Sequence, residues 1–127
     1  MSTSDLGASG ADRLTATPPG VALCPLETLA DPGARNFVLQ IGQARFHGFV
    51  VRKGGAVHGY VDRCPHMGLP LAQTLDDYLT PSGELIACSW HGALFRPDDG
   101  RCVGGPCAGD SLLAWPVEVS EGVIRTA

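Results

Sequence analysis

The sequence has little positive charge and no long hydrophobic run. Its nine Lys and Arg residues are outnumbered by 13 Asp and Glu residues, which gives a formal net charge of −4, and the basic residues form no stripe that would bind nucleic acid. No apolar run approaches the roughly 18 residues that a membrane-spanning helix requires. We therefore expect no nucleic-acid partner and no membrane-inserted segment.

The N-terminal end carries no recognisable targeting signal. Residues 1–20 contain neither the apolar core of a signal peptide nor a twin-arginine pair. They are instead rich in Ser, Thr, Ala, Gly and Pro, a composition with too little apolar surface to fold alone. We expect a flexible leader over residues 1–20 and a cytoplasmic, monomeric protein.

The chain also lacks an amphipathic helical period of useful length. With 127 residues and 44% hydrophobic content, it can form one domain, which we place at residues 21–127. Short β-branched and aromatic runs separated by Gly-containing turns such as Lys53-Gly54-Gly55 predict an all-β, antiparallel fold. A single helical turn is expected within Thr74–Leu79. The expected strands cover residues 21–24, 36–41, 44–52, 56–61, 84–87, 93–96, 101–103, 113–119 and 123–125.

One short motif occurs twice: a cysteine and a histidine followed closely by a glycine. The first copy is Cys64-Pro65-His66-Met67-Gly68 and the second is Cys88-Ser89-Trp90-His91-Gly92. Each follows a predicted strand, so two strand ends can each present one thiolate and one imidazole to a shared inorganic centre. Thiolate is the soft ligand that iron–sulfur clusters need, and glycine lets backbone N–H groups approach closely. The pattern predicts a four-ligand metal site split over two loops.

Two other kinds of site use the same residue types. A mononuclear zinc site can be built from two Cys and two His, but zinc modules usually pair CxxC with HxxxH and do not mix both types within each loop. A catalytic Cys–His dyad normally takes its nucleophile and base from distant segments, whereas here each His lies one or two residues from a Cys. Both alternatives fit the spacing less well than a cluster does.

The paired motifs Cys64-x-His66 and Cys88-x-x-His91 resemble the signature of Rieske [2Fe-2S] proteins. The resemblance implies one [2Fe-2S] cluster, with one iron held by Cys64 and Cys88 and the outer, reducible iron held by His66 and His91. It also implies the Rieske fold, an antiparallel β-sandwich base with a smaller cluster-binding subdomain, here about residues 63–107. Gly105-Pro106 aligns with the proline loop of that family.

The resemblance extends to soluble Rieske-type ferredoxins, which carry one electron from a flavin-type reductase to a terminal oxygenase by transient docking. We expect no catalysis in this chain, because an oxygenase also needs a mononuclear iron site and the 36 residues after His91 contain no histidine. One alternative is the small subunit of a nitrite-reductase-like complex. Another is a zinc-stapled interaction module.

The other cysteines and histidines, and the residues around the two motifs, support weaker predictions. Cys24, Cys102 and Cys107 are expected to be buried thiols, and His47 and His58 to be structural. Because Ala93 and Phe95 stand where respiratory Rieske proteins have hydroxyl side chains, the resemblance implies a low reduction potential. Acidic side chains are expected to steer partners electrostatically at the edges of the docking face. These are Asp76, Asp77, Asp98 and Asp99.

Overall fold

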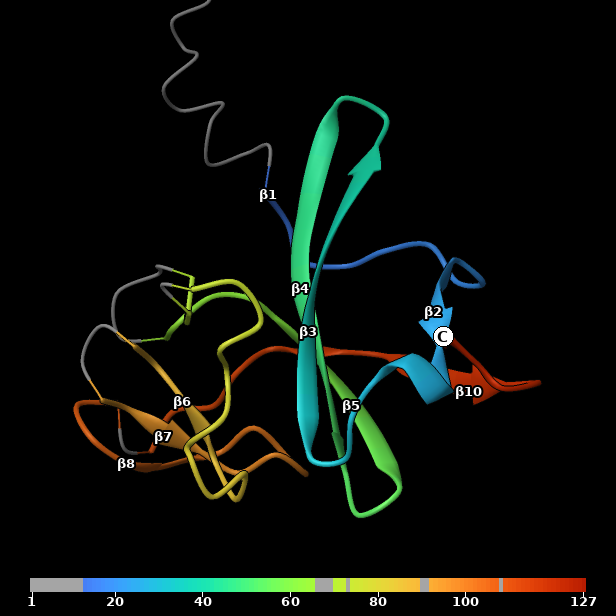
Figure 1. Ribbon diagram of the computed structural model, residues 1–127. Helices are drawn as coiled ribbons and strands as arrows, with labels where there is room; N and C mark the ends of the chain where they lie inside the picture. The colour runs from blue at the N-terminus through green and yellow to red at the C-terminus, as the bar shows by residue number, and fades with distance from the viewer. Residues whose placement is uncertain (1–12, 66–69, 73, 90–91, 108) are drawn as a thin grey trace, which may run out of the picture.

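The computed structural model describes residues 13–65, 70–72, 74–89, 92–107 and 109–127, and over these residues the regular structure is almost entirely β (Figure 1). A three-residue 3-10 turn, Leu26–Thr28, is the exception within this part of the chain. The strands are β1 (Arg13–Leu14), β2 (Ala22–Pro25), β3 (Gly33–Ile41), β4 (Ala44–Lys53), β5 (Ala56–Val61), β6 (Ile86–Ala87), β7 (Leu94–Phe95), β8 (Cys102–Gly104), β9 (Ala114–Trp115), β10 (Val117–Ser120) and β11 (Val123–Thr126).

The strands form three sheets. The largest has five strands in the order β1-β4-β5-β9, with β3 on the other edge of β4, and β3, β4 and β5 form the expected antiparallel meander. A C-terminal sheet has the order β10-β11-β2, and a small sheet has the order β6-β7-β8. Figure 1 shows the small sheet on one side of the five-stranded sheet and the C-terminal sheet on the other. The all-β prediction is confirmed.

Strand β4 is buried on both faces because its sequence is apolar on both. Phe46 and Val50 point into a core shared with the C-terminal sheet, whereas Phe49 and Val51 point into a second core shared with the small sheet. All four side chains have 0% exposure. Alternate residues of a strand face opposite sides, so this one strand joins the two halves of the molecule.

The first core belongs to the β-sandwich base. Its largest buried side chain, Trp115, lies 4.6 Å from the ring of Phe46 between centroids, as expected for a core tryptophan. Close packing here depends on a missing side chain, because a Cβ at Gly48 would lie 2.5 Å from Cε2 of Phe46 and 2.7 Å from Cε3 of Trp115. Glycine in the middle of β4 is therefore required by the position of the indole ring.

The second core lies beneath the small sheet and contains both predicted thiolate ligands. Cys64 and Cys88 belong to it together with Phe49 of β4 and Tyr78 of the connector between the two motifs. The rings of Phe49 and Tyr78 stack with centroids 4.2 Å apart and planes 9° apart. The small sheet falls within residues 63–107, the span predicted for the cluster-binding subdomain.

Residues 13–20 differ from the expectation of a flexible leader over residues 1–20. β1 pairs in parallel with β4, and Thr17 accepts a hydrogen bond of 2.8 Å from the indole nitrogen of Trp115. The carbonyl of Pro18 accepts another of 2.8 Å from the hydroxyl of Thr126. These partners supply the buried polar groups of the core with hydrogen bonds, so this part of the leader is ordered against the domain. Residues 1–12 lie outside the described residues.

The expected strands are found with small changes at their ends. Ala56–Val61 matches β5, and the expected strand over residues 113–119 is divided into β9 and β10 at Pro116, which lacks the N–H needed to continue a ladder. Thr74–Leu79 forms hydrogen-bonded turns and no helix in the described residues. No helix in the described residues is long and apolar enough to span a membrane.

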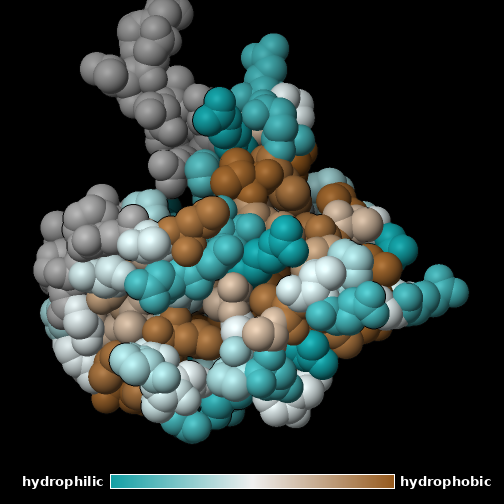
Figure 2. Space-filling model, in the orientation of Figure 1, coloured by the Kyte–Doolittle hydropathy of each residue, from teal (hydrophilic) through white to brown (hydrophobic). Residues whose placement is uncertain are grey.

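The β3–β4 hairpin extends beyond the other sheets (Figure 1). On the face shown in Figure 2, apolar residues gather on this hairpin below a polar tip. Val38 of β3 is 52% exposed. Leu39 and Ile41 are partly buried against the core of the base. The hairpin is thus anchored by its apolar side chains.

We predict that Gly48→Ala lowers the free energy of unfolding by about 1–3 kcal/mol, because the new Cβ overpacks the ring contacts of Trp115. Denaturant unfolding followed by far-UV circular dichroism measures the change. The matched control is Gly104→Ala, where a Cβ would meet no atom nearer than Cδ1 of Leu94 at 3.6 Å. Equal destabilisation in the two variants would contradict the packing argument.

Candidate metal centre

The first motif begins directly after β5. The hydrogen bond from Asp62 N to His47 O at 3.0 Å continues the pairing with β4, and the bond from Arg63 N to Val61 O at 2.9 Å closes a tight turn. They turn the chain so that Cys64 enters the core with 0% exposure. A thiol carried into the protein at the end of a strand is held in place by its backbone and is shielded from water.

The second motif begins directly after β6. Cys88 N donates to Ala93 O at 2.8 Å, and Gly92 N donates to Cys88 O at 3.0 Å, so the loop is closed on itself. Gly92 has a φ of 73°, a conformation that favours glycine, and a Cβ built there would meet no atom within 4 Å. Cys88 is 2% exposed. The loop thus presents a second buried thiol.

His66 and His91, the two predicted imidazole ligands, lie outside the described residues. In the described part of the chain no three His, Cys, Asp or Glu side chains converge as metal ligands. The four-ligand set Cys64, His66, Cys88 and His91 therefore stays a prediction.

A third segment packs against the second loop. Gly105 adopts a φ of 87°, and a Cβ there would lie 2.7 Å from Cα of Ala93 and 3.1 Å from the carbonyl oxygen of Gly92. Only glycine allows the two backbones to approach this closely. Gly105-Pro106 is therefore placed beside the second motif, where the proline loop was expected.

The first loop depends on a buried carboxylate that sequence analysis did not single out. Asp62 is 6% exposed, and its Oδ2 accepts hydrogen bonds from the Tyr78 hydroxyl at 2.7 Å and from Nδ2 of Asn36 at 3.3 Å. Its Oδ1 accepts a third from Leu71 N at 2.9 Å. These three donors satisfy both oxygens of the buried Asp62 side chain.

This carboxylate also connects the two motifs. Leu71, bound through its N–H to Asp62, accepts a hydrogen bond of 2.7 Å at its carbonyl from Ser89 N in the second loop. Hydrogen bonds therefore link Asp62 in the first loop to Ser89 in the second through a single residue, Leu71. Burial, followed by the charge of Asp62, raises the pKa of Tyr78 well above its usual value, so the phenol remains a hydrogen-bond donor.

Four of the five cysteines lie in the core beneath the small sheet. Cys64, Cys88, Cys102 and Cys107 are buried there, and Cys24 is buried in the core of the base. None of them forms a disulfide. The expectation of buried thiols at Cys24, Cys102 and Cys107 is confirmed. Burial first, and then the neighbouring Cys102 and Cys64, raise the pKa of the Cys107 thiol to about 12.

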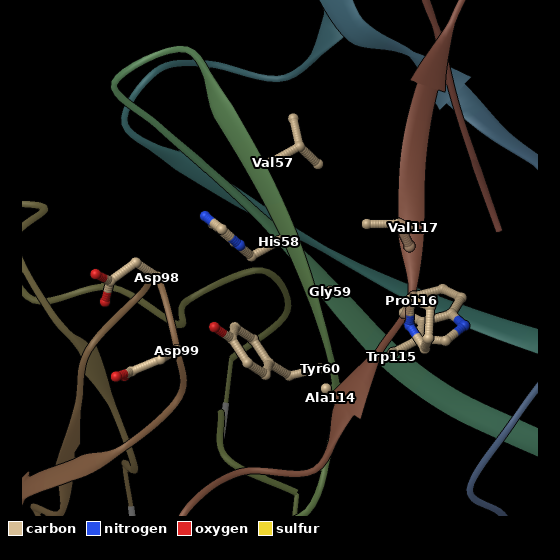
Figure 3. A pocket seen from close by; sticks show the side chains of 10 residues that line it. All are labelled: Val57, His58, Gly59, Tyr60, Asp98, Asp99, Ala114, Trp115, Pro116 and Val117. Atoms are coloured by element: carbon tan, nitrogen blue, oxygen red, sulfur yellow. The ribbon is translucent and has the colours of Figure 1, made fainter. Parts of the chain in front are cut away.

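A cavity of about 220 Å³ lies between β5 and the turn that joins β7 to β8 (Figure 3). Figure 3 shows His58 of β5 facing Asp98 across it, with Tyr60 beside Asp99. Asp99 is engaged with Arg96, whose hydrogen bond lowers the pKa of the Asp99 carboxyl. Neither Cys64 nor Cys88, the two predicted ligands among the described residues, lines this cavity.

The same turn carries two of the acids that were expected to steer a partner, Asp98 and Asp99. β7 and β8 are joined by the turn that carries Asp98 and Asp99, whereas Gly92 and Gly105 lie at the other end of the hairpin. Asp98 and Asp99 are thus remote from the loop ends and face β5. Steering of a partner by these acids stays a prediction, because two of the predicted ligands, His66 and His91, lie outside the described residues.

The donor set fits an iron–sulfur cluster. Two buried thiols without a disulfide follow two strand ends, and a glycine segment lies against one of the loops.

A model of the Rieske [2Fe-2S] domain family matches residues 21–119, which is most of the chain. The chain belongs to this family. Membership of the Rieske [2Fe-2S] family implies one [2Fe-2S] cluster and is inconsistent with the zinc alternative.

Solved structures agree with this assignment. A chain from the structure titled "Complex of reduced oxygenase and oxidized ferredoxin in carbazole 1,9a-dioxygenase" has a TM-score of 0.66 and 27% identity, with 84% of this chain and 100% of that chain covered. The ferredoxin of carbazole 1,9a-dioxygenase from Nocardioides aromaticivorans IC177 has a TM-score of 0.64 and 21% identity, with 87% and 98% covered. These matches confirm the Rieske fold.

A curated relative is "Carbazole 1,9a-dioxygenase, terminal oxygenase component CarAa" from Sphingomonas sp., which is 38% identical over 80 residues. The match covers 58% of this chain and 20% of the relative, so the chain matches about a fifth of that protein's length.

We predict that Tyr78→Phe lowers the free energy of unfolding by about 1.5–3 kcal/mol, because Asp62 loses its shortest side-chain donor and remains buried. Denaturant titration measures the loss, and the visible absorbance of the cluster shows whether the motifs stay in place. The matched control is Tyr60→Phe, which removes a 2.6 Å bond to the neutral carbonyl of Pro97 and should cost about 0.5–1.5 kcal/mol. A smaller loss at Tyr78 than at Tyr60 would contradict a role for the charge of Asp62.

Proposed function

We propose that this protein is a one-electron carrier whose [2Fe-2S] cluster is held by Cys64, His66, Cys88 and His91. The observation that carries the proposal is the family match, which spans both motifs. It is supported by the burial of Cys64 and Cys88 at two strand ends. When bound, a [2Fe-2S] cluster supplies reversible one-electron transfer.

The residues of the chain set the charge at this site. Two thiolates and two neutral imidazoles give the centre two fewer negative charges than four thiolates would, so an added electron is less strongly repelled. Cys64 and Cys88 bring the thiolates into the core, while the Asp62 network holds the first loop and its link to the second. The protein thus provides a dry and fixed environment for electron transfer.

The partners we propose are a flavin-type reductase as donor and a terminal oxygenase as acceptor. Support comes from the ferredoxin that is similar to this chain over 98% of its own length and belongs to a carbazole 1,9a-dioxygenase. We propose that the chain itself performs no catalysis, acts in the cytoplasm as a monomer, and docks transiently through the face bearing His66 and His91.

We predict that protein isolated without oxygen contains two irons and two acid-labile sulfides per chain, because the four ligands match that stoichiometry. Iron and sulfide analysis and the rhombic EPR signal of the reduced protein measure this. In the variant His66→Cys a cluster can still assemble, with a lower potential from the added thiolate charge. One zinc and no sulfide in protein made with adequate iron would contradict the proposal.

The proposed role is tested by electron transfer. The reduced protein should pass one electron to a Rieske-type oxygenase, and the double variant Cys64→Ala/Cys88→Ala, which has lost both thiolates, should not. Co-purification with a stable large subunit would instead support the nitrite-reductase-like role.

We predict a reduction potential near the low end of the Rieske range, about −150 mV, whereas the upper end is roughly +300 mV. The reason is that Ala93 and Phe95, both fully buried, have no hydroxyl to donate to cluster sulfur. Voltammetry at neutral pH gives the value. Ala93→Ser and Phe95→Tyr should each raise it, and a wild-type potential well above zero would contradict the prediction.

A further inference from the structure

The connector between the two motifs is hydrogen-bonded to both of them through one residue, Tyr78. Its hydroxyl donates to Oδ2 of Asp62 at 2.7 Å, and Asp62 lies two residues before Cys64. Its carbonyl accepts a hydrogen bond of 2.8 Å from Ala87 N, one residue before Cys88. The position of Tyr78 therefore bears on the spacing of the two loops that carry the thiols.

The side chain of Asn36 in β3 binds Tyr78 from the five-stranded sheet. Its Nδ2 donates to the Tyr78 hydroxyl at 2.7 Å. Two further acceptors surround the same nitrogen, Oδ2 of Asp62 at 3.3 Å and the carbonyl of Gly48 at 3.4 Å, and an amide nitrogen has two hydrogens to donate. The Tyr78 hydroxyl thus accepts from Asn36 while it donates to Asp62, which fixes the phenol between the sheet and the first motif.

The backbone of Asn36 binds the connector at a second point. Asn36 N donates to Oδ1 of Asp76 at 2.8 Å. Asp76 has a φ of 67°, in the left-handed region that Asp and Asn adopt more readily than most other residues with a side chain. Tyr78 N donates to Asp76 O at 3.0 Å, so the turn at Asp76 leads directly to the phenol that Asn36 also binds. One residue of β3 therefore binds the connector at two positions that are two residues apart.

We propose that Asn36 and Asp76 are positioning residues that clamp the connector to β3 and thereby fix the spacing of the loops that carry Cys64 and Cys88. The consequence for the cluster rests on the proposed function, because it takes both thiols as cluster ligands. Ligand loops keep a single geometry only when packing and hydrogen bonds behind them lock their positions. The sequence suggested Asp76 as a steering acid, and its bond to Asn36 gives it this role within the protein as well.

The test applies hydrogen–deuterium exchange and EPR to variants of the full-length protein with its cluster. Asn36→Leu keeps a side chain of similar size without the amide, and Asp76→Gly keeps the left-handed turn without the carboxylate. Relative to the amides of β11, each should speed exchange at the N–H groups of Leu71, Ala87 and Ser89 by about 3- to 10-fold, the factor that one lost hydrogen bond accounts for. Each should also broaden the EPR lines of the reduced cluster, because the ligand loops then adopt a range of geometries.

Three control variants separate positioning from a general loss of stability. Asp76→Asn keeps an oxygen acceptor and tolerates the same φ, so it should match the wild type in exchange and in EPR. Gln40→Leu removes an amide from the same strand, where Nε2 donates to Gly42 O at 3.0 Å, and should leave both readouts unchanged. Leu29→Ala opens a cavity in the core of the base and lowers stability there, and it should also leave both readouts unchanged.

Several outcomes would overturn the proposal. One is unchanged exchange at the three amides in both Asn36→Leu and Asp76→Gly, and another is an Asp76→Asn protein that behaves like Asp76→Gly. The same relative change in Leu29→Ala would reflect stability alone, and faster exchange with unchanged EPR lines would mean that the clamp has no effect on the cluster. If Asn36→Leu does not fold, the two variants of the exposed Asp76 decide.

Failure of the wild-type protein to assemble a [2Fe-2S] cluster would refute the proposed function itself. The exchange comparison would still test the clamp in that case, because it reports on the two loops and needs no signal from the cluster.

Discussion

The buried carboxylate of Asp62 must be satisfied by hydrogen-bond donors, and this requirement organises the region around the predicted ligands. An uncompensated carboxylate in a core costs several kcal/mol, so the donors are constrained to reach it. They come from β3 through Asn36 and from the connector through Leu71 and Tyr78. The first motif, its connector and the meander are therefore fixed by one charged group, two residues before Cys64.

The meander in turn gives the motifs a rigid support. β4 places Phe46 and Val50 in the core of the base and Phe49 and Val51 in the core beneath the small sheet. Electron transfer is fastest when the site reorganises little, and a sheet with both faces packed has little room to deform. The same double burial explains why the small sheet needs only short strands, since its stability comes from packing onto a larger sheet.

The sequence predicted these elements where local pattern decides the structure. β4 and β5 were found almost to the residue because their apolar runs are bounded by Gly-containing turns, and the paired motifs revealed two buried thiols at strand ends. The Asp62 network could not be predicted. Asn36 and Tyr78 are 42 residues apart, Asn36 and Asp62 are 26 apart, and such pairs leave no local pattern.

Contacts between residues far apart in the sequence also determine the positions of two other segments. Thr17 and Pro18 have the composition of a linker, and their order depends on Trp115 and Thr126, near the other end of the sequence. Likewise, the position of the Asp98–Asp99 turn relative to the motifs depends on the direction in which the β7–β8 hairpin points.

The parallel pairing of β1 with β4 has a consequence for solubility. β5 covers one edge of β4 from Gly48 to Lys53, and the part of that edge at Arg45 and Phe46 is covered by β1. Unpaired strand edges are templates for intermolecular β-pairing, and a two-residue strand is enough to occupy the donors and acceptors that remain. The N-terminal segment thus covers the part of the β4 edge that β5 leaves open to pairing with another chain.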